Sequence, residues 1–299
     1  MPNRFFYFFS LAFLIGSTFL SWNVIQEGKA YQQEKEAYTQ ALNYRNRFLD
    51  PAEWTAKEET AQKLEAAEQT QAVLQVLKKR TFRQALYLGG LLMCYIGLTL
   101  FFYFKSKTYS VLVLGFIIAA LACLPVGLMA PMLEIGAFER NLDLGDIPIS
   151  AKVLGVNVNV QVAQSFPGDM YFYYQSKSVV ELISLLFQQK NWVVGGSILL
   201  FSILFPISKI LLTLLMVFIP RITDRKWVKY IVEKSGKWSM ADVFVVAVFL
   251  AFLAFSNMQV GITTDSKVLV GLYFFLGYCL LSLMSSVWVG KLSIDAGGN

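Results

Sequence analysis

The residue types that carry most enzymatic and metal chemistry are scarce in this sequence. No histidine is present, which excludes an imidazole base and an imidazole metal ligand. The cysteines Cys94, Cys123 and Cys279 lie far apart within apolar segments, and they form no C-x-x-C pair for zinc or redox chemistry. Without histidines or clustered carboxylates, no nucleophile–base or metal constellation can be assembled. We therefore expect a protein that is not an enzyme and that needs no cofactor or metal.

One lysine lies deep within an apolar segment. Lys209 is about ten residues from the end of the segment 192–219, which corresponds to about 15 Å of helix. A charge at this depth of a bilayer costs at least about 2.5 kcal/mol, so we expect its side chain to face the interior of a helix bundle or a wet cavity. The alternatives are that it snorkels, or that it bonds to backbone carbonyls that Pro206 leaves free.

Long apolar segments dominate the chain around this lysine. Hydrophobic residues make up 56% of the sequence and charged residues 15%, against about 25% charged residues in soluble domains. A helix needs about 20 mostly apolar residues to cross a hydrocarbon core of about 30 Å. The sequence therefore predicts an all-α polytopic membrane protein with six transmembrane helices. Their expected positions are 5–22, 85–104, 111–132, 192–219, 241–256 and 268–289.

The positive charges indicate how these spans are oriented. The net charge of +6 comes from Lys and Arg residues beside apolar segments, which favours topogenic signals over nucleic-acid binding. The loop 221–240 is strongly basic, so we expect this loop, the loop 105–110, both termini and the tail 292–299 to be cytosolic. The basic run 78–83 disagrees, because the same count places it on the outer side. We interpret 1–22 as an uncleaved signal anchor; a cleaved signal peptide would leave the later orientation unchanged.

The segment 23–84 differs from the apolar spans on either side of it. It is rich in Gln, Glu, Lys and Ala and predicts two helices that form an external helical hairpin. Asp50 and Pro51 followed by Glu53 are typical of a helix start, with an N-cap, a proline at the first position and an acid in the first turn. This hairpin is either a solvated spacer or a docking site for a partner.

A small external β-hairpin is expected at about 150–176. Valines alternate with Asn and Gln over 156–162, which is the period-two pattern of a half-buried strand. Residues 166–169, Phe-Pro-Gly-Asp, are typical of a turn, and the aromatic-rich segment 170–175 is expected to return as the second strand. The alternative is that these aromatic residues lie in the headgroup region of the bilayer.

Short motifs in the later spans suggest a family. Residues 236–244 read Gly-Lys-Trp-Ser-Met-Ala-Asp-Val-Phe, residues 205–211 read Phe-Pro-Ile-Ser-Lys-Ile-Leu, and residues 129–132 read Met-Ala-Pro-Met. The first motif resembles the W-S-M-x-D-V-F signature of the paraquat-inducible protein A family, and the other two are similar to its proline-lysine and Pro-Met elements. The resemblance covers a four-span unit at 110–291, which follows a second span and a cytosolic link at 85–109. The signature residues are Trp238, Ser239, Met240, Asp242 and Phe244.

This resemblance implies a bacterial inner-membrane protein that helps to move lipids between the inner and outer membranes. The implied partners are phospholipid and a periplasmic protein with MCE domains, which form hydrophobic tunnels. Well-known members carry cytosolic zinc ribbons and often two copies of the unit. This chain has one copy and no zinc ribbon, and it adds two N-terminal spans.

Under this interpretation, Lys209 contacts an anionic lipid headgroup, and kinks at Pro206 and Pro131 make lateral openings possible. Asp242 is better explained by a structural role, because Ser239 and Asp242 have the spacing of a capping box at the start of a span. The candidates for the lipid pathway are Lys209, Pro206, Ser208, Pro131, Met132, Glu134 and Asn257, of which Glu134 and Asn257 would form the polar mouth of a cavity.

The sequence is compatible with two functions. The first is a lipid-transport component whose helix bundle takes lipid from the bilayer and passes it to an external tunnel protein. The second is a scaffold or sensor whose external hairpin docks a partner. The two differ over the bundle interior, because transport needs a lipid-sized cavity, expected near Lys209, whereas a scaffold can be packed solid.

Overall fold

The computed structural model describes residues 4–55, 57–153, 156–218, 247 and 263–296 of the 299-residue chain. Among these residues, 5 helices are long and apolar enough to cross a membrane. They overlap all the predicted spans except 241–256, which apart from residue 247 lies outside the described residues. In chain order the elements are α1 (Arg4–Ala41), α2 (Tyr44–Phe48), α3 (Pro51–Thr55), α4 (Lys57–Ser106), α5 (Tyr109–Met129), β1 (Leu133–Val153), β2 (Val156–Lys177), α6 (Val179–Gln188), α7 (Trp192–Leu199), η1 (Leu200–Leu204), α8 (Phe205–Phe218), β3 (Thr263–Val268) and α12 (Val270–Ala296).

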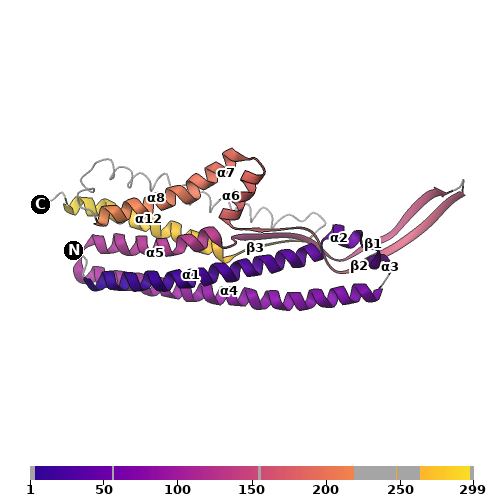
Figure 1. Ribbon diagram of the computed structural model, residues 1–299, viewed down its shortest axis with the longest axis horizontal. Coiled ribbons are helices and arrows are strands. Elements are labelled where there is room, and N and C mark those ends of the chain that lie inside the picture. Colours follow the sequence, from indigo (N-terminus) through magenta and orange to yellow (C-terminus); the bar gives the residue numbers. More distant parts are fainter. Residues whose placement is uncertain (1–3, 56, 154–155, 219–246, 248–262, 297–299) are drawn as a thin grey trace.

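Helix ends from distant parts of the chain gather at one end of the bundle. The rings of Phe6, at the start of α1, and Phe102, near the end of α4, are 5.7 Å apart. At the start of α5, Tyr109 stacks on Trp288 of α12 with 5.8 Å between ring centroids. The start of α1, the α4–α5 connection and the later part of α12 therefore lie together, at the end of the bundle opposite the sheet (Figure 1).

Helix α5 forms the core of the bundle and is buried along almost its whole length. Glycines let its neighbours approach closely. A Cβ added at Gly127 would lie 2.8 Å from the backbone of Phe275 on α12, and one added at Gly115 would lie 2.2 Å from Thr99 on α4. Small residues at such contacts are typical of membrane helices, where van der Waals packing between backbones drives association.

The segment 23–84, predicted as a separate helical hairpin, mostly forms extensions of two membrane helices. Helix α1 runs without a break from the first predicted span to Ala41, and α4 runs from Lys57 into the second. Between them α3 begins at Pro51 with Glu53 in its first turn, as predicted. A small second core joins these extensions to the sheet; its buried members are Tyr31, Tyr38, Leu42, Leu74, Tyr171 and Leu269.

A buried ion pair holds the turn between α1 and α4 against the sheet. Both Nε and Nη2 of Arg47 donate to the Glu53 carboxylate at 2.9 Å, and the two side chains are 3% and 5% exposed. The Arg47 guanidinium also donates to the carbonyl oxygens of Pro167 at 2.9 Å and Asp169 at 3.3 Å. Removing one partner of a buried pair costs about 3–5 kcal/mol, so this contact fixes the turn on β2.

The sheet differs from the predicted β-hairpin. Strands β1 and β2 pair antiparallel over most of their length, and β3 pairs with the first part of β1, which gives the order β2-β1-β3. The segment 156–162 therefore pairs with 147–153 and not with 170–175. The turn predicted at 166–169 is wrong, because these residues lie inside β2.

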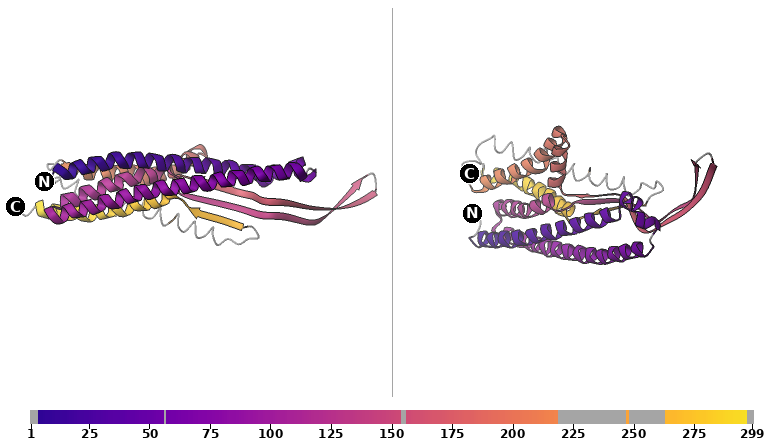
Figure 2. Two further views of the ribbon diagram at one scale, coloured as in Figure 1. Left: turned by 90° about the horizontal axis from the view of Figure 1, so that it is seen from below. Right: turned by 45° about the vertical axis from the view of Figure 1, so that its right-hand side comes forward.

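Pro167 and Gly168 form an irregularity within a strand where the sequence predicts a turn. The register between β1 and β2 shifts between Arg140 and Leu142, where Asn141 has a φ of 52° and Gly168 a φ of 82°. The Gly168 N–H donates to Asn141 Oδ1 at 2.8 Å. A proline without an N–H and a glycine with positive φ suit a bulge as well as a turn, so the local pattern does not distinguish them. Beyond this point the β1–β2 ribbon projects past α2 and α3 (Figures 1 and 2).

Candidate functional site: a pocket between helices α4 and α12

A pocket of about 960 Å³ lies between α4 and α12, at the end of the bundle nearest the sheet. We call it the α4–α12 pocket. Its volume is at the upper end of the range of about 300–1,000 Å³ that is usual for ligand pockets. The α4 side of its wall is supplied by Phe82, Ala85, Leu86, Gly89, Gly90 and Met93. These positions recur at three- and four-residue spacing, so they form one face of the helix.

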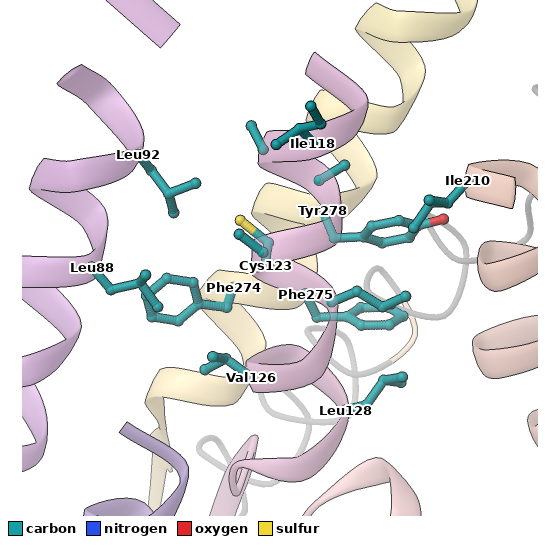
Figure 3. Packing of buried hydrophobic residues seen from close by; sticks show 14 of the residues in the cluster. Leu88, Leu92, Ile118, Cys123, Val126, Leu128, Ile210, Phe274, Phe275 and Tyr278 are labelled. Atoms are coloured by element: carbon teal, nitrogen blue, oxygen red, sulfur yellow. The ribbon is translucent and has the colours of Figure 1, made fainter. Parts of the chain in front are cut away.

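The opposite wall and the base of the pocket come from other elements. Val270, Tyr273 and Phe274 line it from α12, and Gly28 of α1 and Pro131 line its base. Figure 3 shows Phe274 pointing from α12 toward Leu88 on α4, whereas Phe275 and Tyr278 point toward the side of Ile210 on α8. Leu88 and Phe274 both belong to the buried core, and Phe274 also lines the pocket, so this side of α12 lies at the boundary between core and pocket.

Two glycines make the α4 wall recessed. A Cβ added at Gly89 or Gly90 would have no heavy atom within 4 Å, which is the reverse of the tight contacts at Gly115 and Gly127. Gly in a helix interior costs about 0.5–1 kcal/mol relative to Ala. No packing contact requires these two glycines, and the space beside them belongs to the pocket.

The end of the pocket nearest the start of α4 is polar. Gln75, Lys78, Lys79 and Thr81 line it there, and both lysines are exposed. None of the described lining residues is acidic. An apolar body with a cationic end is the arrangement that an amphiphile with a negatively charged headgroup would fit.

A buried carboxylate, Glu134, contacts the pocket lining through Tyr31. Glu134 on β1 is 4% exposed, and its Oε2 accepts hydrogen bonds from the hydroxyls of Tyr31 at 3.0 Å and Tyr174 at 3.4 Å. Lys267 Nζ on β3 is 4.0 Å from its other oxygen. Burial, followed by the Glu134 charge, raises the pKa of Tyr174 well above its usual value, so this phenol stays protonated and donates. Tyr31 also lines the pocket, so the network links the pocket to the sheet.

The predicted candidates near α5 are divided by the structure. Pro131 lines the pocket, and Glu134 lies behind it through Tyr31. The expected helix kink at Pro131 is wrong, because α5 ends at Met129 and Pro131 follows it. Met132 is buried, and its carbonyl accepts from the Leu269 N–H at 2.9 Å, which holds β3 and α12 to the end of α5.

The predicted candidates on α8 lie away from this pocket. Lys209 is 4% exposed and faces the bundle interior, as expected, but neither it nor Pro206 nor Ser208 lines the α4–α12 pocket. A π-helical turn, η1, ends two residues before Pro206, which has no N–H to donate to the carbonyl of Ser202. Ser208 is exposed. Asn257 and the signature residues Trp238, Ser239, Met240, Asp242 and Phe244 lie outside the described residues.

The sequence interpretation missed the residues of α4 that shape this pocket. Lys78 and Lys79 entered it only as charges that disagree with the expected orientation, and Gly89 and Gly90 did not enter it at all. A signal was present: Lys79, Phe82, Leu86 and Met93 share one helical face with Gly89 and Gly90. A pocket cannot be read from that face alone, because its opposite wall comes from residues about 180 positions later in the chain.

Comparison with known proteins agrees with the resemblance found in the sequence. Residues 168–292 match the family model described as paraquat-inducible protein A. The match starts within β2 and runs through α7, α8 and most of α12, so it includes the α12 wall of the pocket but not the α4 wall. No curated protein and no solved structure matches the chain. The chain is thus a multi-pass membrane protein with a region similar to that family.

Proposed function

We propose that this chain is an inner-membrane component of an intermembrane lipid-transport system, which passes phospholipid between the bilayer and a periplasmic partner with MCE domains. The observation that carries the proposal is the α4–α12 pocket. It is of ligand size, its wall is mostly apolar, and its cationic end lies where the apolar part of α4 begins. The family match over residues 168–292 supports the same conclusion independently.

The shape of the pocket suits a lipid that enters from the side. Phe82, Leu86, Met93 and Tyr273 each line it and are 58–70% exposed in the chain, as expected of side chains at an opening that faces acyl chains rather than protein. Acyl chains would lie along the face that includes Gly89 and Gly90. The headgroup would lie beside Lys78 and Lys79, close to the sheet.

The arrangement of the ends supports a lipid site on the periplasmic side of the membrane. The basic loop 221–240 follows α8, which ends at Phe218. The ring centroid of Phe218 is 6.2 Å from that of Tyr7, near the start of α1. With that end cytosolic, the β1–β2 ribbon, which projects from the opposite end, is periplasmic (Figure 1). The polar end of the pocket is then on the periplasmic side too. The proposed mechanism is binding and conformational change without covalent chemistry or a cofactor.

A scaffold or sensor is the second candidate, and the projecting ribbon is the observation that favours it. The Arg47–Glu53 pair holds the turn of the helical hairpin on β2, so hairpin and ribbon form one surface that a partner could use. A scaffold gives no reason for a pocket of about 960 Å³ beside two unpacked glycines, and we therefore prefer transport.

A mild-detergent affinity purification of the full chain tests the proposal. Co-eluting proteins and lipids are identified by mass spectrometry. Retained phospholipid together with a co-purified MCE-domain protein is the expected result. A lipid-poor preparation, or one bound only to an unrelated partner, would contradict transport and favour the scaffold.

A further inference from the structure

Four cations precede the apolar part of α4 without acidic neighbours. The sequence contains no Asp or Glu anywhere in 69–133. In the proposed orientation these cations lie on the outer side of the membrane, where the positive-inside rule predicts few of them. A role other than orientation is therefore needed for this basic cluster, which consists of Lys78, Lys79, Arg80 and Arg83.

The structure separates the basic cluster into two halves. Lys78 and Lys79 line the α4–α12 pocket, whereas Arg80 and Arg83 do not. The helical repeat accounts for this separation. Lys78 and Lys79 lie one turn before Phe82, on the face that continues to Gly89, whereas Arg80 points to the other side of the helix.

The pocket end around these two lysines has donors but no negative charge. No described acidic side chain forms an ion pair with either lysine, and the neighbouring lining residues Gln75, Thr81 and Tyr31 are neutral. The one buried carboxylate nearby, Glu134, already accepts hydrogen bonds from Tyr31 and Tyr174. Two cationic side chains that line the same end of an apolar pocket, with no acidic residue among the lining, favour the binding of an anion there.

We infer that Lys78 and Lys79 bind the phosphate of a phospholipid with a net negative headgroup, so that the pocket selects anionic over zwitterionic phospholipids. This inference rests on the proposed function, because it assigns the substrate class of the same pocket. A zwitterionic headgroup would bring its own ammonium to a site with two lysines and no carboxylate to receive it. An anionic headgroup of glycerol type brings hydroxyls, which Gln75 and Thr81 can meet.

The test compares two lipids on the purified full chain in detergent. Phosphatidylglycerol and phosphatidylethanolamine with identical acyl chains compete for binding, and the bound lipid is counted by native mass spectrometry. We expect phosphatidylglycerol to be preferred about 10- to 30-fold, which is what two lysines near an anionic headgroup provide. The double substitution Lys78→Gln and Lys79→Gln should bring the preference close to one. Lys78→Arg with Lys79→Arg should keep it.

The other half of the basic cluster gives the matched control. Arg80→Gln with Arg83→Gln removes the same amount of charge from the same basic cluster but outside the pocket, and it should leave the preference unchanged. An equal loss in both double variants would overturn the inference, since general attraction at the interface would then explain it. Circular dichroism of each variant shows that the helices are intact, as expected for changes at exposed positions.

The remaining outcomes separate this inference from the function on which it rests. Equal binding of both lipids to the unaltered chain would overturn headgroup selection and leave lipid transport standing. Failure to bind either lipid would overturn the proposed function itself. Inorganic phosphate at constant ionic strength should not displace the lipid; displacement at similar concentrations would mean that the site recognises free phosphate.

Discussion

The two sides of α12 are packed in opposite ways. Toward α5 the helix is in backbone contact: a Cβ at Gly127 would lie 2.8 Å from Phe275, and Phe275 and Tyr278 are fully buried. Toward α4 the same helix presents Tyr273 and Phe274 to a pocket of about 960 Å³. Both sides are apolar, so composition does not explain the difference.

The difference lies in what the glycines face. On α5, Gly115 and Gly127 are filled by a neighbouring helix, whereas on α4, Gly89 and Gly90 are not. Lipid tails are as apolar as leucine, so hydrophobicity alone does not close a gap between membrane helices. Close contact must come from shape, and the α4–α12 side lacks it. The open side of α12 is therefore the candidate site, and the closed side holds it in place.

The largest expected effect separates neighbouring aromatic residues on α12. Phe275→Ala should lower the free energy of unfolding by about 3–5 kcal/mol, because it opens a cavity in the packed core. Tyr273→Ala, which trims a side chain that is 63% exposed, should cost much less. Unfolding of both variants by SDS titration from detergent micelles measures this. Similar losses in the two variants would mean that the pocket side is packed as tightly as the core side.

A glycine at the start of α12 should show the next largest effect. A Cβ at Gly271 would lie 2.5 Å from the Ala130 carbonyl oxygen and 2.8 Å from that of Pro131, and both are backbone atoms that cannot turn aside. Gly271→Ala should therefore destabilise by about 1–3 kcal/mol through overpacking. Gly97→Ala on α4, where nothing lies within 4 Å, should be neutral or stabilising in the same titration. Two equal effects would contradict the assigned contacts.

A smaller loss is expected where the sheet supports the mouth of the pocket. Tyr31→Phe removes the hydroxyl that donates to Glu134 at 3.0 Å. The free energy of unfolding should fall by about 1.5 kcal/mol, near the low end for a hydrogen bond to a charged group, because Tyr174 still donates to the same carboxylate. Tyr38→Phe, on the same helix and in the same small core, is the matched control and should be nearly neutral. Hydrogen exchange of β1 reports the loss locally. Unchanged exchange in Tyr31→Phe would show that the network does not hold the sheet.

Much of this arrangement was predictable from the sequence, because the rules that govern it are local. Apolar length predicted the spans, and Asp50, Pro51 and Glu53 predicted the helix start at α3. The β-hairpin prediction failed because Pro167 and Gly168 suit both a turn and a bulge, and only the partner strand decides between them. The helical hairpin was predicted as a separate unit because the composition becomes polar after the first span. A change to polar composition does not by itself end a helix, and α1 continues to Ala41.

The candidate site was harder to predict, because it depends on contacts between distant segments. Lys209 was expected inside the bundle and is buried there, but burial of a charge does not say which cavity it serves. Pro131 was chosen as a helix kink and lines the pocket from a connecting segment instead. Gly89 and Gly90 are ordinary in sequence, and only the position of α12 makes them a recess.

The measurement that tests the account most directly is the amount of phospholipid that stays with the purified chain when the recess is filled. Gly89→Trp places a large side chain on the pocket wall, where an added Cβ has no atom within 4 Å, and Gly97→Trp places the same side chain on the same helix at a position that does not line the pocket. After extensive washing in detergent, lipid phosphorus per chain should fall to near zero in Gly89→Trp and remain at the unaltered level in Gly97→Trp. Equal retention in both variants, with both folded, would contradict the claim that the space between α4 and α12 holds a phospholipid.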